Sequence, residues 1–187
     1  MFYKKNQQPK VQKQNYAFID SQNLNLGIQK NGWKMDWRKF RAYLKQEHNV
    51  SQAYMFIGYM QEHEAMYQQL HDAGYLIVLK PTVGMLAGDE AKQKPAIKGN
   101  IDAELVLYAM KELPNFQQAI IVSGDGDFYC LAEYLAAKNR LKCIMTPNRY
   151  YSTLLRPFET SMIRLDQLKA RLQHIDSVKN LHQHLDH

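Results

Sequence analysis

Four aspartates at three separated points of the chain are the residues best suited to metal-assisted chemistry. Asp20 ends an apolar run, Asp102 opens a stretch with helical spacing, and Asp125 and Asp127 directly follow another apolar run. Like charges that lie close together repel each other unless a cation sits between them. Carboxylate oxygens are the ligands that Mg²⁺ and Mn²⁺ prefer, and such an ion can activate water and neutralise charge on a phosphodiester. The aspartates therefore form a candidate metal site.

The elements that must position these carboxylates alternate between strand and helix. The short, fully apolar run at residues 119–122 predicts a strand that is buried on both faces. Apolar runs also predict strands at 16–19, 51–58, 75–79, 141–145 and, as a shorter one, 161–165. Helical patterns lie after Asp36, at 62–72, 101–110 and 128–138, and from Asp166. This order predicts an α/β fold in three layers, α/β/α, with a mostly parallel central sheet of five to six strands.

The acidic points are expected to meet at one edge of that sheet. In a doubly wound sheet the first strand is central, and ligands bind where the winding direction reverses, outside the carboxyl ends of the strands. If the fourth strand lies beside the first, Asp20 and Asp125 flank this crevice, and Asp102 starts its helix at the same edge. The alternative for each residue alone is structural, because aspartate is common at helix N-caps and in turns.

Composition sets broad limits on the protein. The chain has 187 residues with a formal net charge of +6, which predicts one domain and suits a polyanionic partner. We expect a basic arm at 1–14, the domain at 15–172 and a His-rich tail at 173–187. Cys130 and Cys143 are expected to be small buried thiols. Without a long apolar segment or an N-terminal secretion signal, we expect a cytoplasmic protein with no membrane contact.

Three motifs in this order resemble the NYN family of PIN-like nuclease domains, in particular its LabA-like (DUF88) branch. They lie at residues 18–24, 98–102 and 122–128, and the similarity extends over about 16–166, through Pro147. The resemblance implies a metal-dependent endoribonuclease that uses Mg²⁺ or Mn²⁺ and acts on RNA. It also implies that Asp20, Asp102, Asp125 and Asp127 are the catalytic residues and metal ligands, with Asn23 and Ser123 in supporting positions.

Basic and aromatic residues are candidates for binding single-stranded RNA, through phosphate contacts and base stacking. Two groups are expected to line the crevice: the lysines at the end of the third predicted strand and in the loop after it, and a basic–aromatic segment after the fifth. The lysines are Lys80, Lys92, Lys94 and Lys98, and the segment is Arg149, Tyr150 and Tyr151. The alternative is a solvated lysine loop and a tyrosine pair packed on the sheet.

Other functions stay open at this point. Many relatives carry a further acidic residue where this chain has Leu107 and Tyr108, which favours a catalytically weak or inactive RNA-binding module as the alternative. A haloacid-type phosphatase needs an aspartate where Gln22 stands, and a Toprim enzyme needs a glutamate where Asp20 stands, so both fit poorly. A homodimer is an alternative to a monomer.

Overall fold

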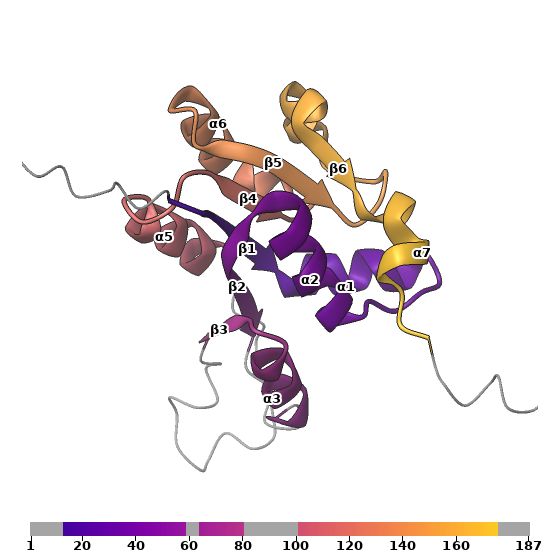
Figure 1. Cartoon of the computed structure of the whole chain (residues 1–187). Helices are drawn as coiled ribbons and strands as arrows, with labels where there is room; N and C mark the ends of the chain where they lie inside the picture. The colour runs from indigo at the N-terminus through magenta and orange to yellow at the C-terminus, as the bar shows by residue number, and fades with distance from the viewer. Residues whose placement is uncertain (1–12, 59–63, 81–100, 176–187) are drawn as a thin grey trace, which may run out of the picture.

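The computed structural model describes residues 13–58, 64–80 and 101–175, and its centre is a six-stranded sheet (Figure 1). Every paired strand runs parallel to its neighbours, in the order β3-β2-β1-β4-β5-β6. This confirms the predicted α/β fold and places β4 beside β1, at the point where the winding direction reverses. The strands are β1 (Asn15–Asp20), β2 (Val50–Gly58), β3 (Leu76–Lys80), β4 (Ala119–Val122), β5 (Leu141–Thr146) and β6 (Met162–Arg164).

Helices cover both faces of the sheet. The helices whose apolar residues join the core on one face are α1 (Ser21–Lys30), α2 (Trp37–His48), α3 (Glu64–Asp72) and α7 (Lys169–Leu172), together with the 3₁₀ turn η5 (Leu165–Leu168). The other face is covered by α5 (Asp102–Glu112), α6 (Tyr129–Ala137) and the 3₁₀ segments η3 (Gly126–Phe128) and η4 (Thr153–Ser161). The molecule therefore has the expected three layers.

The central strands separate two apolar cores. Along β1, Ala17 and Ile19 point to one core while Tyr16 and Phe18 point to the other. This follows from the alternation of side chains along a strand. All residues of β1 and β4 are buried, as the continuous apolar runs predict for strands covered on both faces. These two strands give the carboxyl edge of the sheet a rigid base.

Three local expectations differ from the structure. Helix α1 was not predicted, because its polar, glycine-containing sequence presents only Leu24 and Ile28 to the core. The helix expected from Asp166 is a 3₁₀ turn followed by four α-helical residues. Cys143 is buried as expected, but Cys130 is exposed, because it lies on the outer side of α6.

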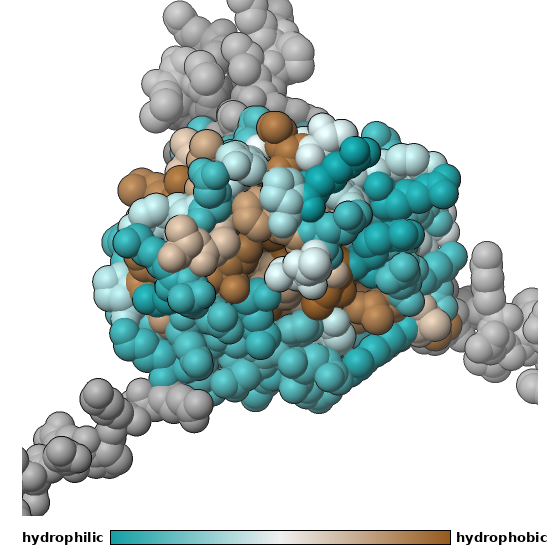
Figure 2. Space-filling model, turned by 90° about the horizontal axis from the view of Figure 1, so that it is seen from above, coloured by the Kyte–Doolittle hydropathy of each residue, from teal (hydrophilic) through white to brown (hydrophobic). Residues whose placement is uncertain are grey.

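Hydrophilic side chains dominate the face shown in Figure 2, with apolar side chains gathered in its middle. The large exposed hydrophobic residues that the structure describes come from separate elements, such as Leu107 on α5, Leu154 on η4 and Tyr150 after β5. Apolar surface of this kind is ordinary for a folded protein. Among the described residues, no helix combines the length and the apolar character needed to span a bilayer.

Candidate active site

Asp20 stands at the centre of the candidate site, at the carboxyl end of β1. It is the N-cap of α1, and its side-chain Oδ1 accepts a hydrogen bond from the backbone N of Asn23 at 3.1 Å. Its second oxygen, Oδ2, accepts a hydrogen bond from the Ser123 hydroxyl at 3.1 Å. Only 4% of the Asp20 surface is exposed. A buried carboxylate with one partner in the first turn of α1 and another directly after β4 is fixed in position by both of them.

The segment after β4 is tied to the segment after β1 by a short chain of hydrogen bonds. The Ser123 hydroxyl accepts a bond from the backbone N of Asp125 at 3.1 Å, while it donates to Asp20. The side-chain oxygen of Asn23 accepts a bond from the backbone N of Gly124 at 2.9 Å. Asp125 then caps η3 by accepting a bond from the backbone N of Asp127 at 3.1 Å. Asn23 and Ser123 thus join the first turn of α1 to the segment after β4, at the switch point of the sheet.

Negative charges converge on Asp20 from two other elements. Its pKa is raised above the ordinary value of 3.8, mainly because burial penalises the charged form, and also because Asp102 and Asp125 carry like charges nearby. The bonds from Asn23 and Ser123 oppose this rise. Asp102 is the first residue of α5, which meets this edge of the sheet. The structure therefore brings Asp102 and Asp125 each within electrostatic reach of Asp20.

Asp127 takes a different position from the other three aspartates. It is exposed on η3, and its charge is not among the causes of the Asp20 shift. Within the described ranges, no three His, Cys, Asp or Glu side chains lie close enough together to hold a metal ion as they are oriented. The donor set itself fits a hard cation, because it contains only oxygen ligands and its charges repel. The metal site with four aspartates remains a prediction.

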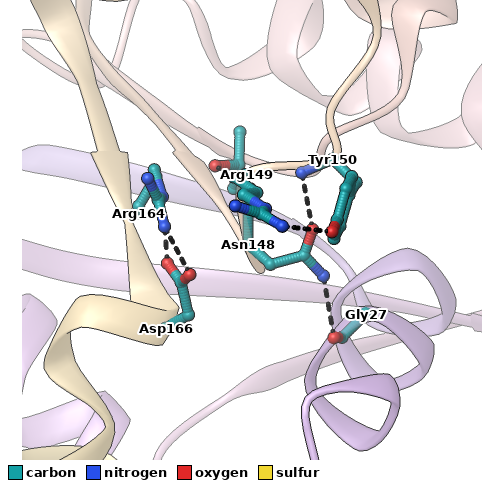
Figure 3. Close-up of polar contacts among 7 residues, drawn as sticks. Gly27, Asn148, Arg149, Tyr150, Arg164 and Asp166 are labelled. Atoms are coloured by element: carbon teal, nitrogen blue, oxygen red, sulfur yellow. Dashed lines mark hydrogen bonds and ion pairs between the residues drawn. The ribbon is translucent and has the colours of Figure 1, made fainter.

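The loop after β5, residues 147–152, forms one wall of the site. Asn148 is buried and holds this loop to α1, because its side-chain Nδ2 donates to the Gly27 carbonyl at 2.9 Å (Figure 3). Its Oδ1 accepts from the backbone N of Tyr150 at 2.8 Å, and its own carbonyl accepts from the Thr146 hydroxyl at 3.1 Å. The loop is therefore anchored to the helix that Asp20 caps.

The same loop packs directly against the glycines that precede and follow Asp125. The backbone N of Ser152 donates to the Gly124 carbonyl at 2.9 Å. A methyl group built on Gly126 would lie 2.4 Å from the Ser152 hydroxyl oxygen and 3.0 Å from a methyl carbon of Leu154. Glycine at position 126 is therefore required by close approach, not by positive φ.

Arg149 and Tyr150 lie on the outer side of this loop. The Arg149 guanidinium donates to the Tyr150 hydroxyl at 2.6 Å and stands 4.8 Å from the ring centroid. Tyr150 is 74% exposed, so most of its ring faces solvent beside the site. Tyr151 is instead half-buried and donates to Glu159 at 2.8 Å. The alternative of a tyrosine packed against the protein thus applies to Tyr151, while the exposed ring of Tyr150 can stack with a base.

The predicted lysines are accounted for only in part. Lys92, Lys94 and Lys98 lie outside the described residues. Lys80 forms an ion pair with Glu104 of α5 at 3.1 Å. At the position where relatives carry an additional acid, Leu107 is 62% exposed, and the Tyr108 ring packs against Tyr54 and Phe56.

Asn148 is the site residue that the sequence analysis missed. Asparagine often bonds to backbone two residues further along, as Asn148 does with Tyr150, and it favours turns after strands. Its position directly after Pro147, at the end of a predicted strand, was the available signal. Nothing local, however, indicated its bond to Gly27, which is distant in sequence.

Replacing Ser123 with alanine tests this chain of hydrogen bonds. We expect the pKa of Asp20 to rise further, because a bond that favours its charged form is lost. The free energy of unfolding should fall by about 1–2 kcal/mol, since the Asp125 N–H loses its acceptor. Carboxyl titration by NMR and denaturant unfolding measure the two effects. Ser21→Ala, beside Asp20 but outside this chain of bonds, is the control, and an unchanged Asp20 pKa in Ser123→Ala would contradict the assignment.

Comparisons with known proteins concern the family and the fold of the chain. A family model described as NYN domain matches residues 16–166. The chain is 26% identical over 163 residues to "Low amplitude and bright protein LabA" of Synechococcus elongatus, covering 83% of this chain and 86% of that protein. A crystal structure of a Vibrio parahaemolyticus protein of unknown function superposes with a TM-score of 0.69 at 22% identity, covering 88% of this chain and 99% of the other. That last likeness concerns the fold alone.

Proposed function

The chain belongs to the NYN domain family, a family of PIN-like nucleases, and from this premise we propose that it is a metal-dependent ribonuclease that cleaves single-stranded RNA. The observation that carries the proposal is the convergence of charge on Asp20 at the switch point of the sheet. Asp20 comes from β1, Asp102 from α5 and Asp125 from the segment after β4, and the latter two raise the pKa of Asp20. Helix capping explains Asp20 and Asp125 separately, and a first-turn position explains Asp102, but neither role requires their charges to meet.

The aspartates would hold the cation, with Asp20 as the fixed ligand. Asp20 is buried and hydrogen-bonded, whereas Asp102 and Asp125 are partly exposed and Asp127 is exposed. When bound, Mg²⁺ or Mn²⁺ supplies Lewis-acid stabilisation of a phosphodiester and lowers the pKa of water. Ser123 and Asn23 hold the start of α1 and the segment after β4 together, and so fix Asp20 beside the segment that carries Asp125.

The RNA strand would approach along the loop after β5. Tyr150 offers an exposed ring for base stacking, and Arg149 beside it offers a charge for a phosphate. This wall is rigid, because Asn148 and Ser152 bind it to α1 and to Gly124. Lys94 and Lys98 remain proposed phosphate contacts from the segment before α5.

A second candidate function is an RNA-binding module of the same fold without turnover. Two observations favour it: an acidic residue is missing where Leu107 and Tyr108 stand, and the described carboxylates are not oriented to hold a metal ion. Such a module would bind RNA with a steep dependence on salt and show no metal-dependent cleavage.

Purified protein incubated with end-labelled single-stranded RNA and DNA tests the proposal. We expect internal cleavage of the RNA with Mn²⁺ or Mg²⁺ and none with EDTA. The same ions should raise the melting temperature, because a cation that binds the folded carboxylates stabilises the folded state. Salt-sensitive RNA binding without cleavage under any metal would identify the RNA-binding module instead. Absence of both binding and cleavage would reject both functions.

A further inference from the structure

A polar cavity lies beside Tyr150, next to the end of α1. Its volume is about 390 Å³, which is within the range of small-ligand pockets. The residues that matter here come from four segments: Asn31 and Trp33 after α1, Arg149 and Tyr150 after β5, Arg164 of β6, and Lys169 of α7. We call this the Trp33 cavity. The cavity shares three residues with the candidate active site, namely Asn148, Arg149 and Tyr150 on the loop after β5.

The charge of the Trp33 cavity favours an anion. Three cationic side chains line it, and the only carboxylate among its lining residues, Asp166, is bound to Arg164 by two hydrogen bonds of 3.1 and 2.6 Å. Figure 3 shows this pair beside the loop that carries Arg149 and Tyr150. Asp166 thus holds the Arg164 guanidinium in place, and Arg149 and Lys169 remain as charges for a ligand.

Trp33 gives an independent indication of a ligand. The residue is only 6% exposed, yet its indole Nε1 has no hydrogen-bond acceptor among the described residues. A buried N–H of tryptophan normally has a partner, because leaving it unpaired costs about 1–3 kcal/mol. Because this nitrogen is closed to solvent as it stands, the indole has to turn toward the cavity before an oxygen atom of a ligand can supply this partner. The sequence alone does not indicate an unpaired N–H at Trp33, because a tryptophan at this position is expected in the core.

The position of the cavity relates it to the candidate active site. Asp20 caps the first turn of α1, and Asn31 caps the last turn and lines the cavity. A helix of this length spans about 15 Å, since each residue rises 1.5 Å. Nucleotides in a stacked strand are about 3.4 Å apart, so about four nucleotides cover this distance. The exposed ring of Tyr150 lines the cavity.

We propose that the Trp33 cavity binds one nucleotide of the single-stranded RNA, about four nucleotides from the phosphodiester held at Asp20. Arg149 and Lys169 contact the backbone phosphate and Tyr150 stacks with a base. The Trp33 indole turns toward the cavity, and its N–H donates to an oxygen of the bound nucleotide. This subsite rests on the proposed function for its substrate, but it makes its own prediction about binding. It explains why a basic, polar cavity continues from the loop that borders the aspartates.

Two variants test the subsite through RNA affinity, measured by fluorescence anisotropy in EDTA with a labelled single-stranded RNA long enough to reach both sites. Trp33→Phe removes the N–H and keeps an aromatic ring, so we expect roughly tenfold weaker binding in a protein that stays folded, with a melting temperature lowered by the smaller ring at a core position. Lys169→Ala should weaken binding several-fold and reduce the slope of log K against log salt by about 0.7, the value for one phosphate contact. Lys45→Ala, at an exposed lysine near the end of α2, is the control and should change neither quantity.

The outcomes separate the subsite from the nuclease. RNA binding that is unchanged in both variants overturns the subsite and leaves the cleavage assay unaffected. Binding that depends on Trp33 and Lys169 in a protein that never cleaves RNA supports the subsite and rejects the nuclease. Binding of a nucleoside monophosphate as tight as that of the oligonucleotide overturns the strand path, because it identifies a mononucleotide site. A wild-type protein that binds no RNA overturns the subsite as well.

Discussion

Replacing Asp20 with asparagine is expected to reduce RNA cleavage by at least about 100-fold while preserving or raising the melting temperature. The loss follows from removing the fixed carboxylate of the proposed metal site, where Lewis-acid stabilisation contributes several kcal/mol and each 1.4 kcal/mol is a factor of ten in rate. Stability is preserved or raised because the substitution removes a buried negative charge that the like charges of Asp102 and Asp125 repel. Asparagine caps helices as well as aspartate does, so α1 should keep its start.

The same substitution should change how stability depends on pH. The pKa of Asp20 is raised in the folded state, so the folded protein binds this proton more tightly than the unfolded chain. Its contribution to stability is therefore fully present below the ordinary value of 3.8 and is lost as pH rises through the folded-state pKa. An asparagine side chain cannot titrate in this range, so this loss should be absent from unfolding curves of Asp20→Asn recorded between about pH 4 and 8.

Asp36→Asn is the matched control for Asp20→Asn. Asp36 is the N-cap of α2 and accepts bonds from the backbone N of Arg38 and Lys39, so the chemical change and the local role are the same. It lies outside the carboxylate cluster, and its substitution should leave cleavage unchanged. Cleavage by Asp20→Asn at the wild-type rate would remove the aspartate cluster from the mechanism. Loss of cleavage together with a large fall in melting temperature would indicate a structural role instead.

The sheet could be predicted because each of its central strands is a short apolar run in the local sequence. Runs such as residues 119–122 and 16–19 are apolar without interruption, as strands covered on both faces must be. The order of alternating elements then restricted the topology to a doubly wound sheet. Within it the position of β4 beside β1 was a condition of the site hypothesis, and the structure meets this condition. Asp20 and Asp125 could be assigned to one edge from this topology alone.

Helix α1 and the Asn148 loop were not predictable in the same way. Only Leu24 and Ile28 of α1 are buried, so its apolar pattern is too sparse to indicate a helix. Its stability comes from the Asp20 cap and from contacts with the loop after β5, which are long-range. Asn148 could be recognised as a turn residue, but its bond to Gly27 connects segments that only the folded structure brings together. The roles of Asn23 and Ser123 likewise became specific only when their hydrogen-bond partners were known.

Gly27→Ala is expected to displace the loop after β5 and to weaken RNA binding about tenfold or more. A methyl group at this position would lie 2.4 Å from Cγ and 2.6 Å from Cβ of Pro147, inside van der Waals contact with a rigid ring. Overpacking of this kind typically costs about 1–3 kcal/mol, more than the roughly 1 kcal/mol that alanine gains over glycine within a helix. The loop must move away from α1, and the bond between Asn148 and the Gly27 carbonyl is then lost.

Displacing this loop moves Tyr150 and Arg149 together, because Asn148 also binds the backbone N of Tyr150. Loss of one stacked base costs about 1–3 kcal/mol of affinity, and loss of a phosphate contact adds to it. RNA affinity by anisotropy and unfolding by denaturant measure the two consequences in one preparation. Gly58→Ala is the control, since a methyl group there meets no described atom within 4 Å. Wild-type affinity in a folded Gly27→Ala protein would show that the position of this loop does not govern RNA binding, because the clash with Pro147 leaves the loop no way to stay where it is.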